Sequence, residues 1–500
     1  MKRVILFLTV CIGQAWALSC SAPVTISEPG FYHYWPKIAL NEHGEALVLW
    51  RTNNDEEEEA PSAATLNADK KWSATALAKL EGDIFRHQPL IDEHGNFYAF
   101  WNLKRENDEG NDEYVYKFAK KEKNNSWLAA VDLFTPIEDK YEMKTSFDAQ
   151  GNVLFLSSHE IKDSQKYSSS YCLEVMKYLH QSNEKKLTIL ADDIGYSSEK
   201  WMFRNKKGAN LTLWSESKYE SGKNWNRLPK TLIAAWSQEG FRWSTPATIF
   251  KSSHAGGYFS ALKAVMNNAE NVAILLEDHN FDSSMNNLVA ITYFKGEWAE
   301  PVPFAISKEN FMNVKIALNN EGDVVAAWAV KEKKKKVIYV ANKSKGQLWS
   351  SPIPIFEQRK YGGSPKIAID DDGNILVACS VKEGKKSVLQ VVCKPVGQPW
   401  SSPLAMTNKE KDVEDVKVRV TNKNCFIVLW KERQKSSSSI YGATLSTATG
   451  EWSSAVLSPE GQQYYEFDVA FNEKGHGIIA WTMRDDNKET HIQAAELNID

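Results

Sequence analysis

Short apolar runs alternate with polar turns along almost the whole chain, and one pattern recurs nine times. Each copy has an apolar stretch, a turn with Asp or Asn three residues before a glycine, and a second apolar run, as in Lys315–Trp328 and Lys366–Cys379. The turn glycines are Gly44, Gly95, Gly151, Gly208, Gly322, Gly373 and Gly475, with Glu270 and Asn424 at the same place in the other two copies. Successive turns lie 51 to 62 residues apart, which is typical of small sheets that stack on their neighbours.

The pattern predicts four short strands in each copy. Asp and Asn hydrogen-bond to the backbone two residues on, and glycine accepts a positive φ, so the turn closes a hairpin between strands one and two. Asn424 also tolerates this conformation, whereas Glu270 is harder to explain. A third run such as Val337–Ala341 follows, and a Trp-Ser-x-Pro segment such as Trp349–Pro352 leads into strand four.

These units predict an all-β fold, a single β-propeller of about nine four-stranded blades. Propellers usually have 4–8 blades, so two alternatives stay open: the third or fifth unit lies outside the ring, or the chain forms two smaller rings. Five hundred residues would suggest several domains by length alone. No linker interrupts the repeat, and we therefore expect residues 20–500 to form one domain.

The two ends of the repeat region are complementary. Ser21–Ser27 aligns with the strand-four segment, and the chain closes with His491–Leu497, which aligns with strand three. Pairing of these N-terminal and C-terminal strands would close the circle and cover two exposed strand edges.

A large aromatic residue ends strand two in most copies. Tryptophan fills the position at Trp50, Trp101, Trp214, Trp328, Trp430 and Trp481, and Cys379 replaces it once. A large flat side chain suits the wedge between adjacent sheets, where its burial contributes about 2–3 kcal/mol. We interpret these residues as packing residues.

The first residues are typical of an export signal. Lys2 and Arg3 precede an apolar run from Val4 to Ile12, and small residues follow at Ala15 and Ala17. We expect residues 1–19 to be a signal peptide, with cleavage after Ala17 or, as in a lipobox, before a lipidated Cys20. The protein would then be secreted or periplasmic, or held at the outer membrane of a bacterium. The apolar run is too short to span a bilayer.

Composition excludes several classes of function. The net charge of −4 with mixed signs argues against nucleic-acid binding. Five cysteines remain outside the signal, and an odd, scattered set is no disulfide framework. Their spacing, and that of the ten histidines, matches no metal site, and we expect no metal and no cofactor.

Aromatic residues gather on the connections between strand four of one unit and strand one of the next. In a ring these connections share one face and differ from blade to blade, as ligand-binding loops do. The candidate ligand-binding residues are Tyr32, Tyr34, Trp35, Arg86, His87, Tyr258, Tyr361 and Tyr464. Flat amphipathic rings suit sugar faces or extended peptides, although the same aromatics could simply pack the blade ends.

The repeats resemble those of secreted bacterial proteins of the sialidase-like propeller superfamily. The Asp-x-x-Gly turn is one residue longer than that family's Ser-x-Asp-x-Gly turn, and Phe85-Arg86-His87-Gln88-Pro89 is similar to its Phe-Arg-x-Pro signature. Family sialidases use three arginines, and the second and third would come from Arg359, Arg433 or Arg484. The departures indicate a propeller without the catalytic residues.

We therefore expect an exported propeller that binds a glycan, a peptide or a protein partner through its aromatic face, with no catalysis. The alternatives are a carbohydrate-active hydrolase in the same ring, or a structural component of a cell-envelope assembly.

Overall fold

The computed structural model describes residues 17–499 except 55–57, 80–81, 107–111, 135–143, 149, 162–169, 180–183, 195–199, 206, 217–229, 238–241, 253–257, 281–282, 359–361, 409–410 and 422–424. Every regular element among these residues is a strand. None of the described residues belongs to a helix long and apolar enough to cross a membrane.

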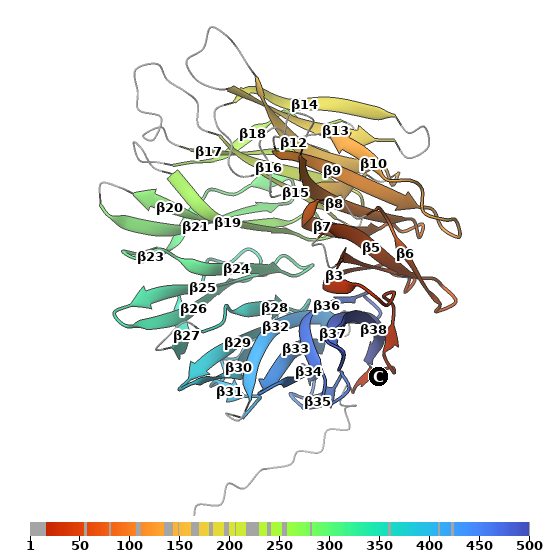
Figure 1. The fold of residues 1–500 in the computed structure, drawn as a ribbon. Coiled ribbons are helices and arrows are strands. Elements are labelled where there is room, and N and C mark those ends of the chain that lie inside the picture. Colours follow the sequence, from red (N-terminus) through yellow and green to blue (C-terminus); the bar gives the residue numbers. More distant parts are fainter. Residues whose placement is uncertain are drawn as a thin grey trace, which may run out of the picture.

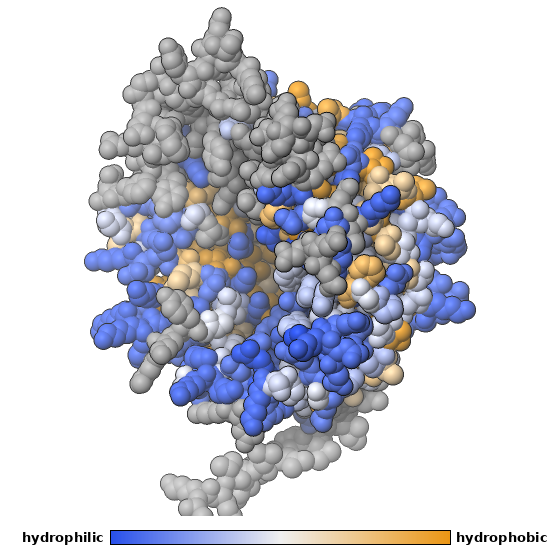
Figure 2. Space-filling view, in the orientation of Figure 1, coloured by the Kyte–Doolittle hydropathy of each residue, from blue (hydrophilic) through white to orange (hydrophobic). Residues whose placement is uncertain are grey.

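The described strands form nine antiparallel sheets, which stand in a ring as the blades of one propeller (Figure 1). The space-filling view shows a hollow between the blades, which we call the central opening (Figure 2). The first four blades are β3 (Tyr32–Leu40), β4 (Ala46–Asn53), β5 (Glu59–Leu66) and β6 (Trp72–Ala76); β7 (Asp83–Ile91), β8 (Phe97–Glu106), β9 (Asp112–Lys121) and β10 (Val131–Phe134); β11 (Thr145–Phe147), β12 (Val153–Ile161), β13 (Ser170–Tyr178) and β14 (Lys185–Ile194); and β15 (Lys200–Arg204), β16 (Asn210–Glu216), β17 (Thr231–Ser237) and β18 (Ala247–Lys251).

The next four blades follow the same order. They are β19 (Tyr258–Met266), β20 (Val272–Asn280) and β21 (Met285–Phe294) with β22 (Glu297–Trp298) and β23 (Val302–Ser307); β24 (Met312–Leu318), β25 (Val324–Glu332), β26 (Lys335–Lys343) and β27 (Ile353–Gln358); β28 (Lys366–Ile369), β29 (Ile375–Glu383), β30 (Lys386–Lys394) and β31 (Leu404–Ala405); and β32 (Asp412–Thr421), β33 (Cys425–Gln434), β34 (Ser437–Ser446) and β35 (Trp452–Val456). The prediction of one nine-bladed ring is confirmed.

Blade nine joins the two ends of the chain. It contains β36 (Gln463–Phe471), β37 (Gly477–Arg484), β38 (Thr490–Ile499), β1 (Leu18–Cys20) and β2 (Val24–Thr25). Leu18 lies opposite Ile499, and Val24 lies opposite Ala494. The predicted closure is therefore present, and its first strand begins at Leu18, three residues before the Ser21–Ser27 segment that we expected to form it.

The turns between strands one and two have the predicted chemistry. Asn41 Oδ1 accepts hydrogen bonds from the backbone N–H groups of His43 and Glu45, each at 3.0 Å, and Gly44 has φ 82°. Glu270 adopts φ 63° and still donates its N–H to the Asn267 carbonyl at 3.2 Å. The chain thus keeps the turn at Glu270 in a conformation that L residues rarely adopt. Asn424 lies outside the described residues.

The core lies between neighbouring blades. Trp50, Trp101, Trp214, Trp328 and Trp481 are at most 1% exposed, and Cys379 is fully buried. Trp328, for example, meets Phe304 edge-on at 5.5 Å and stacks on Tyr339 at 6.1 Å. The interpretation of the strand-two tryptophans as packing residues is confirmed.

Candidate functional site

Trp35 stands on the variable face, which we define as the face where the inner strands begin, opposite the Asx–Gly turns. The register of β3 shifts between Tyr34 and Lys37, and Trp35 has φ 54°. A bulge of this kind re-aims a side chain. Trp35 is accordingly 42% exposed and leaves part of its flat apolar ring open to solvent.

Neighbouring side chains hold Trp35 in place. The Arg51 guanidinium lies over the indole, 4.3 Å from its centroid, in a cation–π contact. Arg51 Nη2 also donates to the Phe85 carbonyl of blade two at 2.7 Å, and its Nη1 lies 3.6 Å from the Glu59 carboxylate. Burial lowers the pKa of Arg51 and raises that of Glu59, while their mutual attraction opposes both shifts. The indole is thus fixed before any ligand arrives.

His87 supports the same residue from blade two. Its Nε2 donates to the Trp35 carbonyl oxygen at 2.7 Å. Burial lowers the pKa of His87 to about 3, against the opposing effect of that hydrogen bond. The imidazole is therefore neutral near pH 7 and carries its proton on Nε2. His87 is a support for Trp35 rather than an acid or base.

Blade nine extends the exposed surface. Tyr34 lies beside Trp35, with ring centroids 6.0 Å apart, and is hydrogen-bonded to Thr490; burial raises its pKa. Arg484 Nη1 lies 3.2 Å from the Tyr465 hydroxyl oxygen, to which it donates. We call Tyr34, Trp35, His87, Tyr465 and Arg484 the aromatic patch. It offers one stacking surface and several hydrogen-bonding groups.

Sequence reasoning found Tyr34, Trp35 and His87 as site candidates but missed Arg51 and Glu59, which also support Trp35. Arg51 and Glu59 lie on strands two and three, away from the connections where we expected ligand-binding residues. A signal for Arg51 was present, because it directly follows the buried Trp50. Lys431 holds the same place after Trp430, and its ammonium likewise bonds the next inner strand, at the Tyr465 carbonyl.

The other predicted ligand-binding residues are scattered. Tyr32 is half-buried on β3, and Arg86 is exposed on β7, where its backbone N–H donates to Asn102 Oδ1 at 2.7 Å. Tyr258 opens β19, but its side chain lies outside the described part of the structure. Tyr361 also lies outside the described residues.

Tyr464 belongs to the core and not to the variable face. It is 3% exposed, its ring meets Trp481 edge-on at 5.9 Å, and its hydroxyl donates to the Pro459 carbonyl at 2.9 Å. A ligand at the surface cannot reach this ring, and Tyr464 is not part of the candidate site.

Cys20 is built into the closing strand. It ends β1 opposite Leu497, and its Sγ lies 3.4 Å from the Leu457 carbonyl oxygen. Burial raises the pKa of the Cys20 thiol to about 11. The side chain packs against the core of blades eight and nine. A Cys20 with an acyl chain on its sulfur would therefore have to leave this packed position.

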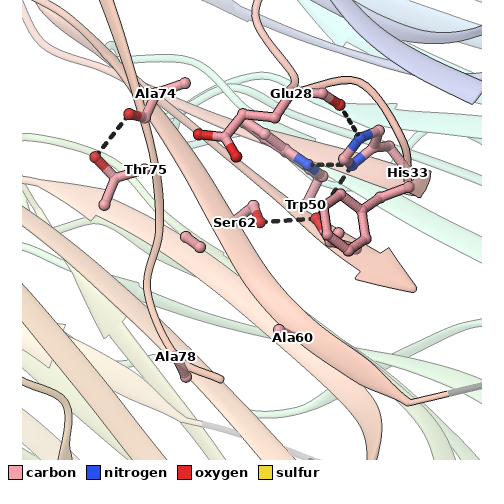
Figure 3. Close-up of a pocket in the computed structure, with 11 residues that line it drawn as sticks. Glu28, His33, Trp50, Ala60, Ser62, Ala74, Thr75 and Ala78 are labelled. Atoms are coloured by element: carbon pink, nitrogen blue, oxygen red, sulfur yellow. Dashed lines mark hydrogen bonds between the residues drawn. The ribbon is translucent and has the colours of Figure 1, made fainter. Parts of the chain in front are cut away.

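A small cavity of about 120 Å³ lies in blade one and is lined by residues of β3, β4, β5 and β6 (Figure 3). His33 Nε2 donates to the Glu28 carbonyl at 2.8 Å, and His33 Nδ1 accepts from the Trp50 indole at 3.0 Å. Thr52 and Ser62 continue the network at 2.7 Å. Burial lowers the pKa of His33 to about 4. Both ring nitrogens are engaged, so the network has a structural role.

A second polar group in blade five has the arrangement of a nucleophile and its base. Ser260 Oγ lies 2.7 Å from His279 Nε2, and His279 Nδ1 lies 2.9 Å from Asn286 Oδ1. An amide oxygen only accepts, so His279 Nδ1 donates to Asn286 and Nε2 faces Ser260. The Ser260 hydroxyl also bonds the Glu277 carboxylate, which lies 3.8 Å from His279 Nε2. This is the order of a nucleophile, a base and an orienting group. Sequence reasoning missed it because the three residues lie on three different strands.

Two other clusters are explained by internal pairing. Asp485, Glu489 and His491 bring potential metal ligands within 4.8 Å of one another, and this is the one such group among the described residues. His491 Nε2 already pairs with Asp485 Oδ2 at 3.1 Å. Of the arginines considered for a sialidase site, Arg433 pairs with Glu414 at 3.0 Å, Arg484 bonds Tyr465, and Arg359 lies outside the described residues.

No protein-family model matches the chain, and no curated protein matches it. Among solved structures, the chain is similar to polysaccharide lyase Uly1, with 8% identity, a TM-score of 0.42 and coverage of 99% of this chain and 94% of that chain. It is similar to a PL25 ulvan lyase bound to -[GlcA(1-4)Rha3S]- (11% identity, TM-score 0.39, 73% and 91% coverage). It is also similar to an α-L-arabinanase of Penicillium chrysogenum with arabinobiose (10%, 0.31, 60% and 92%).

These neighbours are carbohydrate-active enzymes, but likeness at such identities and TM-scores says nothing about the activity of this chain. The resemblance to sialidase-like propellers stays a prediction.

Proposed function

We propose that this propeller binds a glycan through the aromatic patch on its variable face. The observation that carries the proposal is the exposure of Trp35 on a rigid mount formed by Arg51, Glu59 and His87. A sugar ring would stack on the indole, and the Tyr34, Tyr465 and Arg484 side chains would bond its hydroxyl groups. Because the support is preorganised, little side-chain entropy is lost on binding.

Glycan and peptide arrays probed with the wild type and with Trp35→Ala test this function. We expect the wild type to retain a set of glycans that Trp35→Ala does not retain, with unchanged thermal unfolding. Arg86→Ala, an exposed neighbour outside the patch, is the matched control and should leave the retained set unchanged. Retention of peptides alone, or identical profiles for wild type and Trp35→Ala, would refute glycan binding at this surface.

We further propose that the chain is exported and cleaved after Ala17, which leaves Leu18 as the first residue. Leu18 is 6% exposed, and its side chain fills the space above Gly442, where an added Cβ would come within 2.4 Å of it. Cleavage before a lipidated Cys20 would remove Leu18 and its pairing with Ile499. Mass spectrometry of the exported protein should find Leu18 at the N-terminus; an acylated Cys20 there would contradict the proposal.

A second candidate function follows from Ser260. In an ester hydrolase, Ser260 Oγ would attack the acyl carbon while its proton passes to His279 Nε2 and then to the departing alcohol. Water would next attack the acyl-enzyme, again giving up its proton to His279, and would release the acid and restore Ser260. Asn286 would hold the imidazole in the required tautomer.

A fluorophosphonate probe tests this candidate. Covalent labelling should occur in the wild type, disappear in Ser260→Ala and drop strongly in His279→Gln. Ser252→Ala is a suitable control, because Ser252, directly after β18, is buried but bonds Asp278 of blade five at 2.7 Å. Absence of labelling in the wild type, or equal labelling of Ser260→Ala, would exclude Ser260 as a nucleophile.

A further inference from the structure

Lysine occupies one equivalent position in six of the nine repeats. The position lies seven residues before the turn glycine or its replacement. It holds Lys37, Lys144, Lys263, Lys315, Lys366 and Lys417, with Gln88, Trp201 and Asp468 in the remaining repeats. These residues lie on the inner strands, or directly before one in the case of Lys144, and the inner strands surround the central opening (Figure 1).

The position has the same register in different blades. Lys37, Lys263, Lys315 and Lys417 each follow a bulge and face the second strand, opposite Leu49, Leu275, Ala327 and Leu429. The lysines are therefore repeated at one level of the ring.

Three adjacent blades carry this lysine with no counter-charge paired to it among the described residues. In the part of the chain that the structure describes, no hydrogen bond or ion pair joins Lys263, Lys315 or Lys366 to another group. The residues two positions earlier are Ala261, Asn313 and Ser364, which are uncharged. We call Lys263, Lys315 and Lys366 the lysine arc.

Blade eight shows the contrasting arrangement. Lys417 Nζ lies 3.4 Å from Asp468 and 3.9 Å from Asp415. The chain thus supplies internal partners for one lysine at this level and leaves the lysines of blades five to seven without them.

The arc is electrostatically unfavourable in the absence of a partner. Burial lowers the pKa of Lys315, and the charges of Lys366 and Lys263 lower it further. The neighbouring side chains Ala264, Ile316 and Ile367 are apolar and half-buried, and Figure 2 shows apolar surface in the hollow beside β19 and β24. Apolar walls around charges of one sign concentrate their field on an oppositely charged ligand.

We propose that the lysine arc binds the carboxylate or sulfate groups of an acidic polysaccharide that enters the central opening. The proposal rests on the proposed glycan binding and names the class of glycan. Three charges on three successive blades match a chain of acidic sugar residues better than they match a single ion. Trp35 and Lys37 lie two residues apart on β3, so a saccharide on the aromatic patch reaches the level of the lysines.

Calorimetric titration of the mature protein with an oligouronate hexasaccharide tests the proposal. The expected result is binding that weakens from 50 to 200 mM salt, as screening of charge requires. Lys315→Gln removes the central charge and should weaken binding at least tenfold. The matched control is Lys417→Gln, at the same level of the ring but internally paired, which should change affinity less than twofold. Thermal unfolding of both variants serves to check that they are folded.

The remaining probes separate the alternatives. Equal losses in Lys315→Gln and Lys417→Gln, or no loss in either, would overturn the arc as a binding site. Inorganic sulfate binding as tightly as the hexasaccharide would indicate a free-oxyanion site, and hexaglutamate binding as tightly would indicate a peptide site; either result overturns the polysaccharide assignment. If Lys315→Gln weakens hexasaccharide binding while Trp35→Ala does not, the arc stands and the aromatic patch fails.

Discussion

The inner strands of blades one and nine bury equivalent ring side chains two residues before the exposed bulge position of blade one. His33 and Tyr464 both lie eleven residues before the turn glycine of their blade. His33 meets Trp50 edge-on at 6.2 Å, as Tyr464 meets Trp481 at 5.9 Å. Both residues are buried. The eleventh position is therefore a core position that covers the strand-two tryptophan.

Two residues further along the strand, at the bulge, the side chain is exposed instead of buried. Trp35 lies nine residues before the turn glycine, and Arg86, Asn313 and Asp415 hold the same place in other blades; all four are exposed. The place of a residue in the repeat, and not its aromatic character, decides whether it packs the core or faces solvent.

The largest expected effect comes from removing the closing strands, which complete blade nine and do not belong to blade one. Deleting residues 18–26 removes β1 and β2 and the buried side chains of Leu18 and Ile26. Burial of these two contributes about 3–6 kcal/mol, before the lost strand pairing is counted. Thermal unfolding should shift to much lower temperature and lose cooperativity. An unchanged midpoint would contradict the closure of the ring through blade nine.

A smaller effect distinguishes the core position from the face position. Tyr464→Ala should destabilise the protein by about 3–5 kcal/mol, as for other large buried aromatics, and Tyr464→Phe by about 1 kcal/mol through the hydrogen bond to Pro459. Urea unfolding measures both. If Tyr464→Ala cost no more than the exposed Trp35→Ala, the distinction between the two positions would be lost.

The dependence of the free energy of unfolding on pH compares His87, which supports the exposed Trp35, with His33, which occupies the buried position. The pKa of His87 is lowered to about 3 and that of His33 to about 4, below the usual value of about 6.5. The unfolded chain therefore takes up protons first, and stability falls as pH drops below about 6.5. His87→Gln keeps a donor for the Trp35 carbonyl, and should show a smaller loss between pH 7.5 and 5 in urea unfolding.

Much of the fold was predictable because it depends on local, repeated chemistry. The Asx–Gly turns and the strand-two tryptophans recur with fixed spacing. These features, and the pairing of the chain ends, appear as expected. The bulges were not predictable, because no single residue type marks them: Trp35, Asn313 and Asp415 share a positive φ but no chemistry.

The candidate site was less predictable for the same reason. Without the bulge, Tyr464 and Trp35 look alike in sequence, so one of them was assigned to the wrong environment. His87 supports Trp35 across the blade boundary, and the Ser260–His279–Asn286 group assembles from three strands. The lysine position could have been found from the repeat alignment, by comparing one column across the nine units.

The affinity of Trp35→Ala for the oligouronate hexasaccharide tests the central claim, that the exposed bulge position of blade one binds the ligand. Calorimetry should show at least a tenfold loss of affinity relative to the wild type, while the urea midpoint changes by less than the equivalent of about 0.5 kcal/mol. Wild-type affinity in Trp35→Ala would contradict the account.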